Sequence, residues 1–571
     1  MISDTSTAAL IARFLKARGV KRVFALCGGH IMPIWMRLDA EDIRIVDVRD
    51  ERAAVHMAQA HAELTGEIGV ALVTAGPAVT NAITGIANAF VSRAPVLVLS
   101  GTPPTLQENR GSLQDIDHTL LVRSITRYAR TVRKPELALQ ELDEAIERAF
   151  GNGGDPGPVY LDFPTDTLRA DVPQALILDE QFKAKPPVVQ WPDPSLVAET
   201  VELLWSAKRP LVISGRGARG AQSELITLLD RLGAVYLDTG ESRGVVPDEH
   251  PSVVNAVRGK VMGQADVVLT IGRRLDFQLA YGSPAIYGEA KFIRIADCQS
   301  ELRDNRRGAV ELLANPAATL ASIVALARDR KPSVDRQWAD GLRAEHEQRA
   351  TKLRKTMVEA PPDKVGRMHP NFLLATLQSR LKKDCVLVTD GGDFLSFSRV
   401  GLSAPTVLDP GPFGCIGVGV PYGIAAGLAF PDRQVVVATG DGSFGFNAME
   451  IDTAARHRVP VVFVVANNGA WQIEVHDQKV THGKVVGTEL QFADHAAMAR
   501  GFGLHAERVE KAEDLGAALD RALANAPALV DVVVSTEAVS SDAKSGLAWV
   551  PDVQPLAAWN DAELKWRAQG K

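Results

Sequence analysis

The chain has 571 residues, of which 46% are apolar and 23% are charged, and its net charge is −6 with an isoelectric point near 6.1. This length exceeds what one hydrophobic core can organise and indicates about three to four domains of ordinary globular composition. The acidic balance argues against a nucleic-acid-binding protein, although a local basic pocket for a phosphorylated substrate is compatible with it.

The spacing of the cysteines and the lack of long apolar runs argue against disulfide-rich or zinc-binding proteins and against membrane proteins. Cys27, Cys298, Cys385 and Cys415 have no paired spacing, so neither a disulfide framework nor a zinc site is predicted. The chain has no run of about 18 apolar residues and no basic segment followed by an apolar one at its start. We therefore expect a cytoplasmic protein that does not enter a membrane.

Strands and helices alternate along three stretches separated by Pro-rich joints. This alternation predicts the α/β class, with three doubly wound parallel-sheet domains and a C-terminal tail. We assign the domains to residues 1–170, 190–335 and 365–535, and the tail to 536–571.

The first stretch places polar residues directly after its predicted strands, which are 22–26, 43–48, 69–74 and 95–100. Open parallel sheets bind ligands at the carboxyl ends of their strands. His30 follows the first strand, Glu51 the second and Asn81 the third, so we expect all three at one edge. The alternatives are a Glu51 that only stabilises a helix dipole, a His30 without a role and an Asn81 that caps its helix.

The middle stretch has predicted strands at 210–214, 267–271 and 291–295. After the first of these comes a Gly-rich, basic turn that contains Arg216 and Arg219. Such a turn suits a phosphate group, although the pattern alone is weak.

The third stretch carries the most informative motif, Gly440-Asp441-Gly442-Ser443 followed by Asn467-Asn468. We expect a strand over 434–439, a tight loop at 440–442, a helix over 447–458 and a strand over 459–466. A strand-helix-strand unit brings the ends of its parallel strands together. Asp441 and Asn468 then face one space, where hard oxygen ligands suit Mg²⁺ and leave room for phosphate oxygens.

This motif resembles the signature of thiamine-diphosphate enzymes, and the resemblance to their pyruvate-oxidase-like group covers nearly the whole chain. That group includes acetolactate synthase, benzaldehyde lyase, oxalyl-CoA decarboxylase and 2-hydroxyacyl-CoA lyase. The resemblance implies thiamine diphosphate and Mg²⁺ as cofactors, and pyrimidine-binding, central and diphosphate-binding domains in that order. A regulatory relic of the same fold is the non-enzyme alternative, but it would have no need for Glu51, Asp441 and Asn468 together.

The resemblance also implies which residues hold the cofactor. Asp441 and Asn468 would bind Mg²⁺ together with the carbonyl of Ala470. The diphosphate would be held by Gly442, Ser443 and the amides of Gly392, Asp393 and Phe394, and Asn81 would lie on the pyrimidine side. Gly414 would bind the aminopyrimidine through its carbonyl, and Ile416 would wedge the cofactor into a V shape. Core packing is the alternative for Ile416.

Catalytic roles follow from the same resemblance. The pyrimidine needs a carboxylate at N1′, and Glu51 is the match; Gln114 and His30 would act on the thiazolium and substrate side. In this group the carboxylate and the metal ligands come from different subunits. We therefore expect a homodimer or homotetramer with shared active sites.

The subclass rests on weaker likenesses. The loops that contain His30 and Gln114 look most like those of benzaldehyde lyase. Two central segments, Arg274–Gly282 and Glu301–Asn305, instead resemble segments of acyl-CoA lyases and oxalyl-CoA decarboxylases. We expect a 2-hydroxyacyl-CoA lyase with a small-molecule acyl-CoA substrate and an ADP or CoA site in the central domain. Its substrate contacts would be Arg216, Arg219, Arg274 and Trp549, the last in a tail that acts as a lid or is docked and inert. The alternatives are a benzaldehyde-lyase-like or acetolactate-synthase-like carboligase acting on 2-hydroxy ketones, or a 2-oxo acid or oxalyl-CoA decarboxylase.

Overall fold

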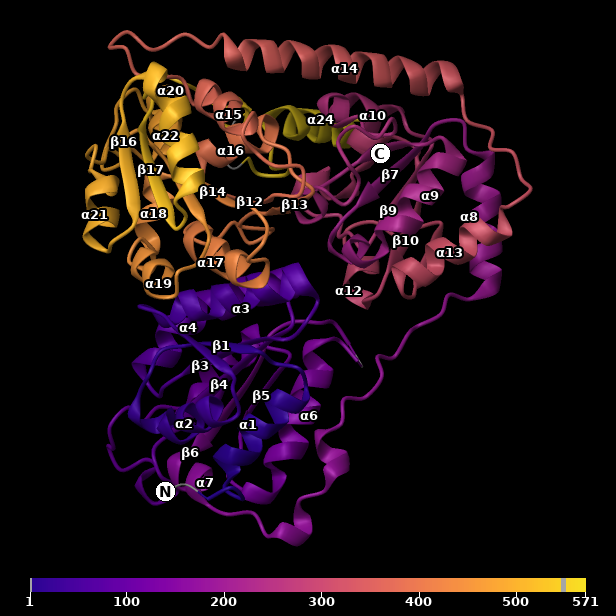
Figure 1. The fold of residues 1–571 in the computed structure, drawn as a ribbon. Helices are drawn as coiled ribbons and strands as arrows, with labels where there is room; N and C mark the ends of the chain where they lie inside the picture. Colours follow the sequence, from indigo (N-terminus) through magenta and orange to yellow (C-terminus); the bar gives the residue numbers. More distant parts are fainter. Residues whose placement is uncertain (1–2, 153, 546–550, 571) are drawn as a thin grey trace.

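The computed structural model describes residues 3–152, 154–545 and 551–570. They form three parallel sheets, each with helices on both faces, as the alternation predicted (Figure 1). The apolar strands are buried on both faces; β15 (Val462–Asn467), for example, is buried along its whole length.

The first sheet has six strands in the order β2-β1-β3-β4-β6-β5. The strands are β1 (Arg22–Ala25), β2 (Arg44–Asp47), β3 (Gly69–Val73), β4 (Val96–Thr102), β5 (Tyr128–Thr131) and β6 (Val159–Pro164). The helices are α1 (Thr7–Ala17), α2 (Met32–Ala40), α3 (Glu51–Thr65), α4 (Pro77–Ser92), α5 (His118–Val122), α6 (Ala138–Ala149) and α7 (Thr165–Arg169). The four predicted strands are confirmed to within two residues, and β5 and β6 were not predicted.

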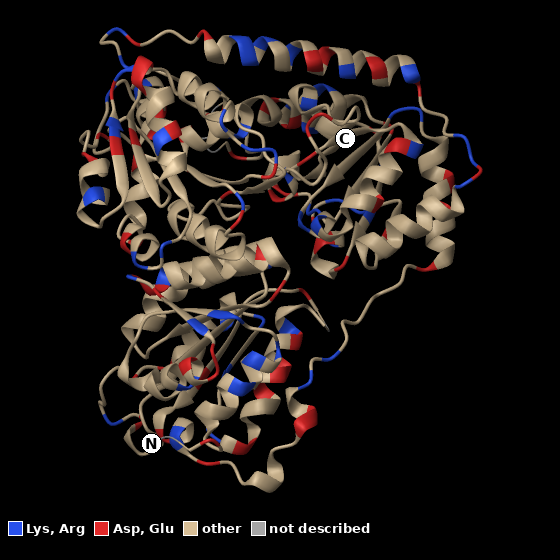
Figure 2. Ribbon diagram, in the orientation of Figure 1, with Lys and Arg blue, Asp and Glu red and all other residues tan. Residues whose placement is uncertain are grey.

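The central sheet has five strands in the order β11-β10-β9-β7-β8. The strands are β7 (Pro210–Ser214), β8 (Val235–Leu237), β9 (Val267–Ile271), β10 (Lys291–Ala296) and β11 (Val310–Leu313). The helices are α8 (Pro194–Ser206), α9 (Gln222–Leu232), α10 (Arg258–Gln264), α11 (Pro284–Tyr287), α12 (Gln299–Leu302) and α13 (Pro316–Leu326). The charged helix α14 (Arg336–Val358) then connects to the third domain, with Lys, Arg, Asp and Glu distributed along it (Figure 2).

The third sheet has the order β13-β12-β14-β15-β17-β16. When the strands of each domain are numbered along the chain, the first and third sheets have the same strand order. Its other strands are β12 (Val386–Asp390), β13 (Thr406–Leu408), β14 (Val435–Gly440), β16 (His505–Val509) and β17 (Ala528–Val533). The helices are α15 (Pro370–Gln378), α16 (Asp393–Gly401), α17 (Gly419–Ala429), α18 (Asp441–Phe446), α19 (Glu450–Arg456), α20 (Gln472–Thr481), α21 (His495–Gly501) and α22 (Ala512–Ala524). The loop predicted at 440–442 is wrong, because α18 begins at Asp441 directly after β14 and α19 is correspondingly short.

The first and third domains share one hydrophobic core. Helix α3 packs along α17, and buried residues of both domains form a single apolar cluster (Figure 1). Between residues 53 and 62, α3 has no Lys, Arg, Asp or Glu, and its charges lie at its two ends (Figure 2). Small side chains such as Ala54, Ala58, Ala425 and Ala426 let the two helices approach closely.

Contacts of α19 orient the two sheets relative to each other. Glu450 at the start of α19 meets the backbone of Arg49 and Asp50, just after β2. His457, just beyond the end of α19, meets Arg44 at the start of β2, so helix and strand run in opposite directions. α19 lies in the crossover between β14 and β15, and a crossover helix runs opposite to the strands it joins. β2 of the first sheet and the strands β14 and β15 of the third sheet therefore run in the same direction. The carboxyl ends of both sheets therefore open to the same side of the chain.

The tail returns to the central domain. Helix α24 (Ala557–Ala568) packs against α11, and its buried Glu563 accepts a hydrogen bond from Ser283. The short helix α23 (Ser541–Lys544) packs against α16 of the third domain. Trp549 lies outside the described residues. Within the described ranges, no helix is both long and apolar enough to cross a membrane.

Gly423 tests the packing of α17 on the third sheet. A Cβ at this position would lie 2.2 Å from Cγ2 of Val437, in β14. We expect Gly423→Ala to destabilise the protein by about 1–3 kcal/mol through overpacking, seen as a lower thermal unfolding midpoint at a fixed scan rate. Gly501→Ala is the matched control, because its Cβ would meet no atom within 4 Å. Equal midpoints for the two variants would contradict this packing.

Candidate active site

Glu51 lies at the edge of the first sheet, at the amino end of α3. Asp50 caps the helix by accepting a hydrogen bond from the backbone N–H of Arg52 at 2.8 Å. The Glu51 side chain is only 7% exposed, and its Oε2 accepts a hydrogen bond from Nδ2 of Asn81 at 3.1 Å. Asn81 lies inside α4, whose cap is Gly76, so the alternative that Asn81 caps its helix is wrong. The two predicted residues are thus in direct contact.

His30 and Gln114 lie together at the same edge. The loop after β1 runs so close to the loop after β3 that a Cβ on Gly28 would lie 2.4 Å from Cβ of Thr74. Burial lowers the pKa of the His30 imidazole, and the neighbouring Gln114 side chain opposes this shift. Nδ1 of His30 is buried and has no hydrogen-bond partner among the described residues. His30 is therefore a neutral imidazole with an unused nitrogen.

A buried histidine–aspartate pair beneath this edge was not predicted. Nε2 of His118 accepts a hydrogen bond from the backbone N–H of Gly76 at 2.8 Å, so its proton lies on Nδ1. Nδ1 is 3.1 Å from Oδ2 of Asp162, which also accepts from the Tyr160 hydroxyl. The pair ties the segment carrying Gln114 to the turn before α4. His118 lies four residues after Gln114, but the sequence alone does not indicate the partner on β6.

Asp441 and Asn468 meet at the edge of the third sheet, as predicted. They follow the neighbouring strands β14 and β15, and Oδ2 of Asp441 accepts a hydrogen bond from the backbone N–H of Gly469 at 2.9 Å. Burial raises the pKa of the Asp441 carboxyl to about 6, although backbone N–H groups oppose the shift. Within the described residues no Lys, Arg or His forms an ion pair with Asp441.

The donor set fits a divalent cation. A buried carboxylate without a cationic partner is unfavourable unless an ion neutralises it. The Asp441 carboxylate, the Asn468 amide oxygen and the Ala470 carbonyl are hard oxygen donors of the type that Mg²⁺ prefers. Asn468 and Ala470 are adjacent in this turn, where Oδ1 of Asn468 accepts from the backbone N–H of Ala470 at 3.2 Å.

The turn after β12 provides a glycine cradle beside this site. Gly391 has φ +127°, which disfavours a side chain, and a Cβ there would lie 3.4 Å from Oγ of Ser443. Gly392 precedes α16 without a side-chain cap among the described residues, so the first amides of α16 are suited to binding an anion. The side chains of Asp393 and Phe394 are buried, and Phe394 belongs to the core of the third domain. Phe394 can therefore offer the site only its backbone N–H group.

Asp390 joins the two glycine segments expected around the cofactor, and it was not predicted. Its carboxylate accepts hydrogen bonds from the backbone N–H of Gly391 at 2.7 Å, Gly417 at 3.0 Å and Gly419 at 2.8 Å. Burial raises the pKa of Asp390 to about 7. The segment that it holds includes Ile416, which is only partly buried and belongs to none of the described core clusters. Core packing of Ile416 is therefore not supported.

Glu51 and Asp441 of one chain are not joined by any hydrogen bond within the described residues. Arg52, next to Glu51, donates through Nη2 to the backbone carbonyl of Phe446 at 2.8 Å, at the end of α18. Both edges open to the same side, so they lie beside each other rather than face to face.

The crevice where a nucleotide would bind in the central domain is closed. The strand order reverses between β7 and β9, and ligands of doubly wound sheets bind outside such a point. Here the backbone N–H of Gly217 donates to the carbonyl of Gly272 at 3.2 Å, so the two loops touch. The buried Arg273 lies over Gly215, and its guanidinium pairs with Glu241 and Asp276, each at 2.8 Å.

Arg216 and Arg219 form ion pairs beside a small cavity that both side chains line. Arg219 pairs with Glu63 of α3 at 2.9 Å. Arg216 pairs with Asp297 at 2.6 Å and Glu301 at 3.3 Å, and Arg93 of the first domain also pairs with Glu301. These bonds join the central domain to the first. Arg274 is exposed and, among the described residues, its guanidinium forms no ion pair or hydrogen bond.

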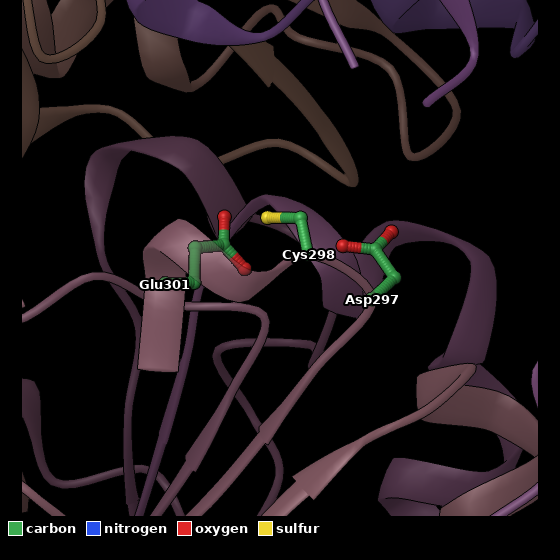
Figure 3. Close-up of side chains that lie close together, drawn as sticks. All are labelled: Asp297, Cys298 and Glu301. Carbon is green, nitrogen blue, oxygen red and sulfur yellow. The ribbon is translucent and has the colours of Figure 1, made fainter. Parts of the chain in front are cut away.

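Asp297, Cys298 and Glu301 point toward one another in the same cluster (Figure 3). Their ligand atoms lie within 4.8 Å of one another, a spacing that could hold a metal. However, Arg216 and Arg93 already neutralise the two carboxylates. Burial also raises the pKa of the Cys298 thiol to about 12, which keeps it protonated. The cluster is therefore an ion-pair network.

Three family models match the chain in series. They are described as the N-terminal TPP binding domain, the central domain and the C-terminal TPP binding domain of thiamine pyrophosphate enzymes. They match residues 5–121, 197–323 and 395–532, respectively. Each match contains one of the three sheets in whole or in large part.

Similar proteins cover nearly the full chain. An acetolactate synthase large subunit from Mycobacterium tuberculosis is 35% identical, covering 92% of this chain and 95% of its own length. The 2-hydroxyacyl-CoA lyase 2 of Caenorhabditis elegans is 32% identical, covering 92% of this chain and 89% of its own length. Its human counterpart is 31% identical, covering 86% of this chain and 83% of its own length.

The closed central crevice predicts that adenine nucleotides do not bind there. Calorimetric titration of the purified protein with ADP or FAD should give dissociation constants weaker than about 1 mM, and the protein should lack flavin absorbance. Saturable binding that Arg273→Ala abolishes would contradict the closure. Binding that Arg273→Ala creates would instead support it, because the substitution removes the side chain that fills the crevice.

Proposed function

This chain belongs to the thiamine pyrophosphate enzymes, and we propose that it is a Mg²⁺-dependent carbon–carbon lyase and carboligase that cleaves a 2-hydroxyacyl-CoA. The products would be formyl-CoA and an aldehyde or ketone. The observation that carries the cofactor assignment is the buried Asp441 carboxylate, which lacks a cationic partner among the described residues and lies beside the Asn468 and Ala470 oxygens.

We propose the cofactor contacts that the family resemblance implies, and the geometry of the two sheet edges is compatible with them. Asp441, Asn468 and the Ala470 carbonyl would hold Mg²⁺. The diphosphate would meet Gly442, Ser443 and the backbone N–H groups at the start of α16. Gly414 and Ile416, in the segment that Asp390 holds, would meet the aminopyrimidine and set its angle to the thiazolium.

The protein's own residues would manage the protons. When bound, thiamine diphosphate supplies a nucleophilic carbon and stabilises the negative charge left when a C–C bond breaks. Glu51 would hold a proton at N1′ of the pyrimidine. His30 would accept the proton of the substrate's 2-hydroxyl as the C1–C2 bond breaks, because burial keeps its imidazole neutral. Gln114 would orient the same hydroxyl.

A second copy of the chain would complete each site. The two half-sites of one chain open to the same side, so Glu51 cannot face Asp441 without a partner related by a two-fold axis. Large apolar side chains are also exposed beside these edges, as an interface requires. They are Met32, Met36, Leu113, Phe413, Phe446 and Met449. We therefore propose at least a homodimer with shared active sites.

The choice of substrate rests on the relatives and on the central domain. The lyases resemble this chain over most of its length, and Arg274–Gly282 and Glu301–Asn305 resemble central segments of acyl-CoA lyases. Acetolactate synthase is the second candidate, because a relative of that name is 35% identical. Of the arginines expected to contact CoA, Arg274 has a guanidinium without a partner among the described residues, and we assign a CoA phosphate to it.

Two substitutions should separate proton transfer from cofactor binding. Glu51→Gln should retain cofactor affinity but lose about 10²- to 10⁴-fold in kcat, because the carboxylate acts on a proton and does not anchor the diphosphate. Asp441→Ala should lose Mg²⁺ and cofactor together. Fluorescence titration with thiamine diphosphate and steady-state kinetics measure both effects. Wild-type behaviour of either variant would refute its assignment.

Mixing the same two variants tests site sharing. Equal amounts of Glu51→Gln and Asp441→Ala chains, unfolded and refolded together, should regain about a quarter of wild-type activity, because half of the dimers then contain one intact site. No recovery, or a fully active monomer in sedimentation experiments, would contradict a shared site.

A side-by-side assay tests the reaction. We expect turnover of 2-hydroxyacyl-CoA with release of formyl-CoA, and little turnover of pyruvate, oxalyl-CoA or benzoin. Arg274→Ala should raise KM for the CoA substrate about tenfold without changing kcat, since a phosphate contact is lost. Arg336→Ala, an exposed arginine on α14, is the matched control. Acetolactate formation from pyruvate would establish the second candidate, and turnover of benzoin alone would refute a role for CoA.

A further inference from the structure

Glu450 of the third domain holds the backbone that leads into Glu51. Its Oε1 accepts a hydrogen bond from the backbone N–H of Arg49 at 2.9 Å and from that of Asp50 at 3.1 Å. These are the two residues immediately before Glu51. The contact spans 400 positions in the sequence and joins two domains.

The Glu450 side chain is itself fixed. It is 1% exposed, and its Oε2 accepts a hydrogen bond from the Thr453 hydroxyl at 2.6 Å. Both carboxylate oxygens are therefore used. A carboxylate near the amino end of a helix is also favoured by the helix dipole, here that of α3. Glu450 thus has one position, and the backbone N–H groups of Arg49 and Asp50 must meet it there.

Neighbouring contacts secure the same end of α3. Arg52, directly after Glu51, donates to the Phe446 carbonyl at 2.8 Å and lies 3.4 Å from Oδ1 of Asn447. Nδ2 of Asn447 donates in turn to the Gly417 carbonyl at 2.6 Å, next to Ile416. Residues on both sides of Glu51 are therefore anchored to the third domain of the same chain.

We propose that Glu450 is a positioning residue, an inference that rests on the proposed function. It sets the position of Glu51 along the axis of α3 and the direction in which the Glu51 side chain projects toward the pyrimidine. Its two hydrogen bonds fix the turn from which the Glu51 side chain projects. Loss of them would let α3 shift along α17 by a fraction of its rise per residue, and catalytic carboxylates tolerate little displacement. In the shared-site dimer, the anchor would lie in one subunit's cofactor domain while Glu51 serves the other subunit's site.

Three variants test this role. Glu450→Ala removes the acceptor, Glu450→Gln retains an amide oxygen for Arg49 and Asp50, and Thr453→Val removes only the bond to the other carboxylate oxygen. The readouts are the exchange rate of the C2 proton of bound thiamine diphosphate by quenched-flow NMR, the cofactor dissociation constant, kcat, KM and the thermal midpoint.

We expect Glu450→Ala to slow C2 exchange and kcat by about tenfold to a hundredfold, with KM and cofactor affinity within about threefold of wild type. Glu450→Gln should recover most of the exchange rate, and Thr453→Val should behave like Glu450→Gln. Unchanged exchange in Glu450→Ala would overturn the proposal. So would equal losses in Ala and Gln variants, or a loss matched by weaker cofactor binding.

Glu51→Gln distinguishes failure of the proposed role of Glu51 from failure of the positioning role of Glu450. If Glu51→Gln does not slow C2 exchange, the proposed function of Glu51 fails, and the role of Glu450 fails with it. If Glu51→Gln slows exchange and Glu450→Ala does not, only the positioning role is refuted.

Discussion

The packing of α3 against α17 is the constraint on which the rest of the structure depends. The two helices are rich in small residues and place the first and third domains in one apolar core. Because that core is continuous, the two sheets cannot rotate independently, and their carboxyl edges open to one side. A chain folded in this way presents two half-sites side by side. This geometry accounts both for the large apolar side chains exposed beside the two edges and for the need for a second copy.

Backbone N–H groups, rather than basic side chains, are the main partners of the buried carboxylates around the site. Asp390 accepts from three of them, Glu450 from two and Asp441 from one or more. Such bonds orient a carboxylate without neutralising it, and burial accordingly raises the pKa of all three groups. Arg93, Arg216 and Arg219 instead pair with carboxylates between the first and central domains and tie these domains together. The charge left at the third sheet therefore favours a cation.

Much of the site could be predicted because its functional residues directly follow apolar strands that the sequence itself reveals. Asp441 and Asn468 each follow an apolar strand, and Glu51 follows another, so their place at sheet edges needs only the rule for parallel strands. Asp390, Glu450 and His118 could not be found in this way. Most of their partners lie far along the chain: backbone N–H groups for Asp390 and Glu450, and the Gly76 N–H and the Asp162 carboxylate for His118. Residue identity alone does not reveal such pairings. Arg216 and Arg219 show the opposite case, in which a local pattern predicts a site that the tertiary structure uses otherwise. The turn suits a phosphate group, but its arginines pair with carboxylates of the protein itself.

The sequence by itself determined the class of fold, the position of most strands and the residues that meet at each sheet edge, because hydrophobic periodicity and turn glycines are local properties. It did not predict α18 at Asp441, the docking of α24 or the strands β5, β6, β8, β11, β12, β13 and β16. Only the tertiary structure decided that the first and third sheets share one strand order, that their edges open to one side and that the central crevice is closed. Each of these depends on contacts between distant segments, whose energies are set by shape complementarity and burial and not by any local pattern.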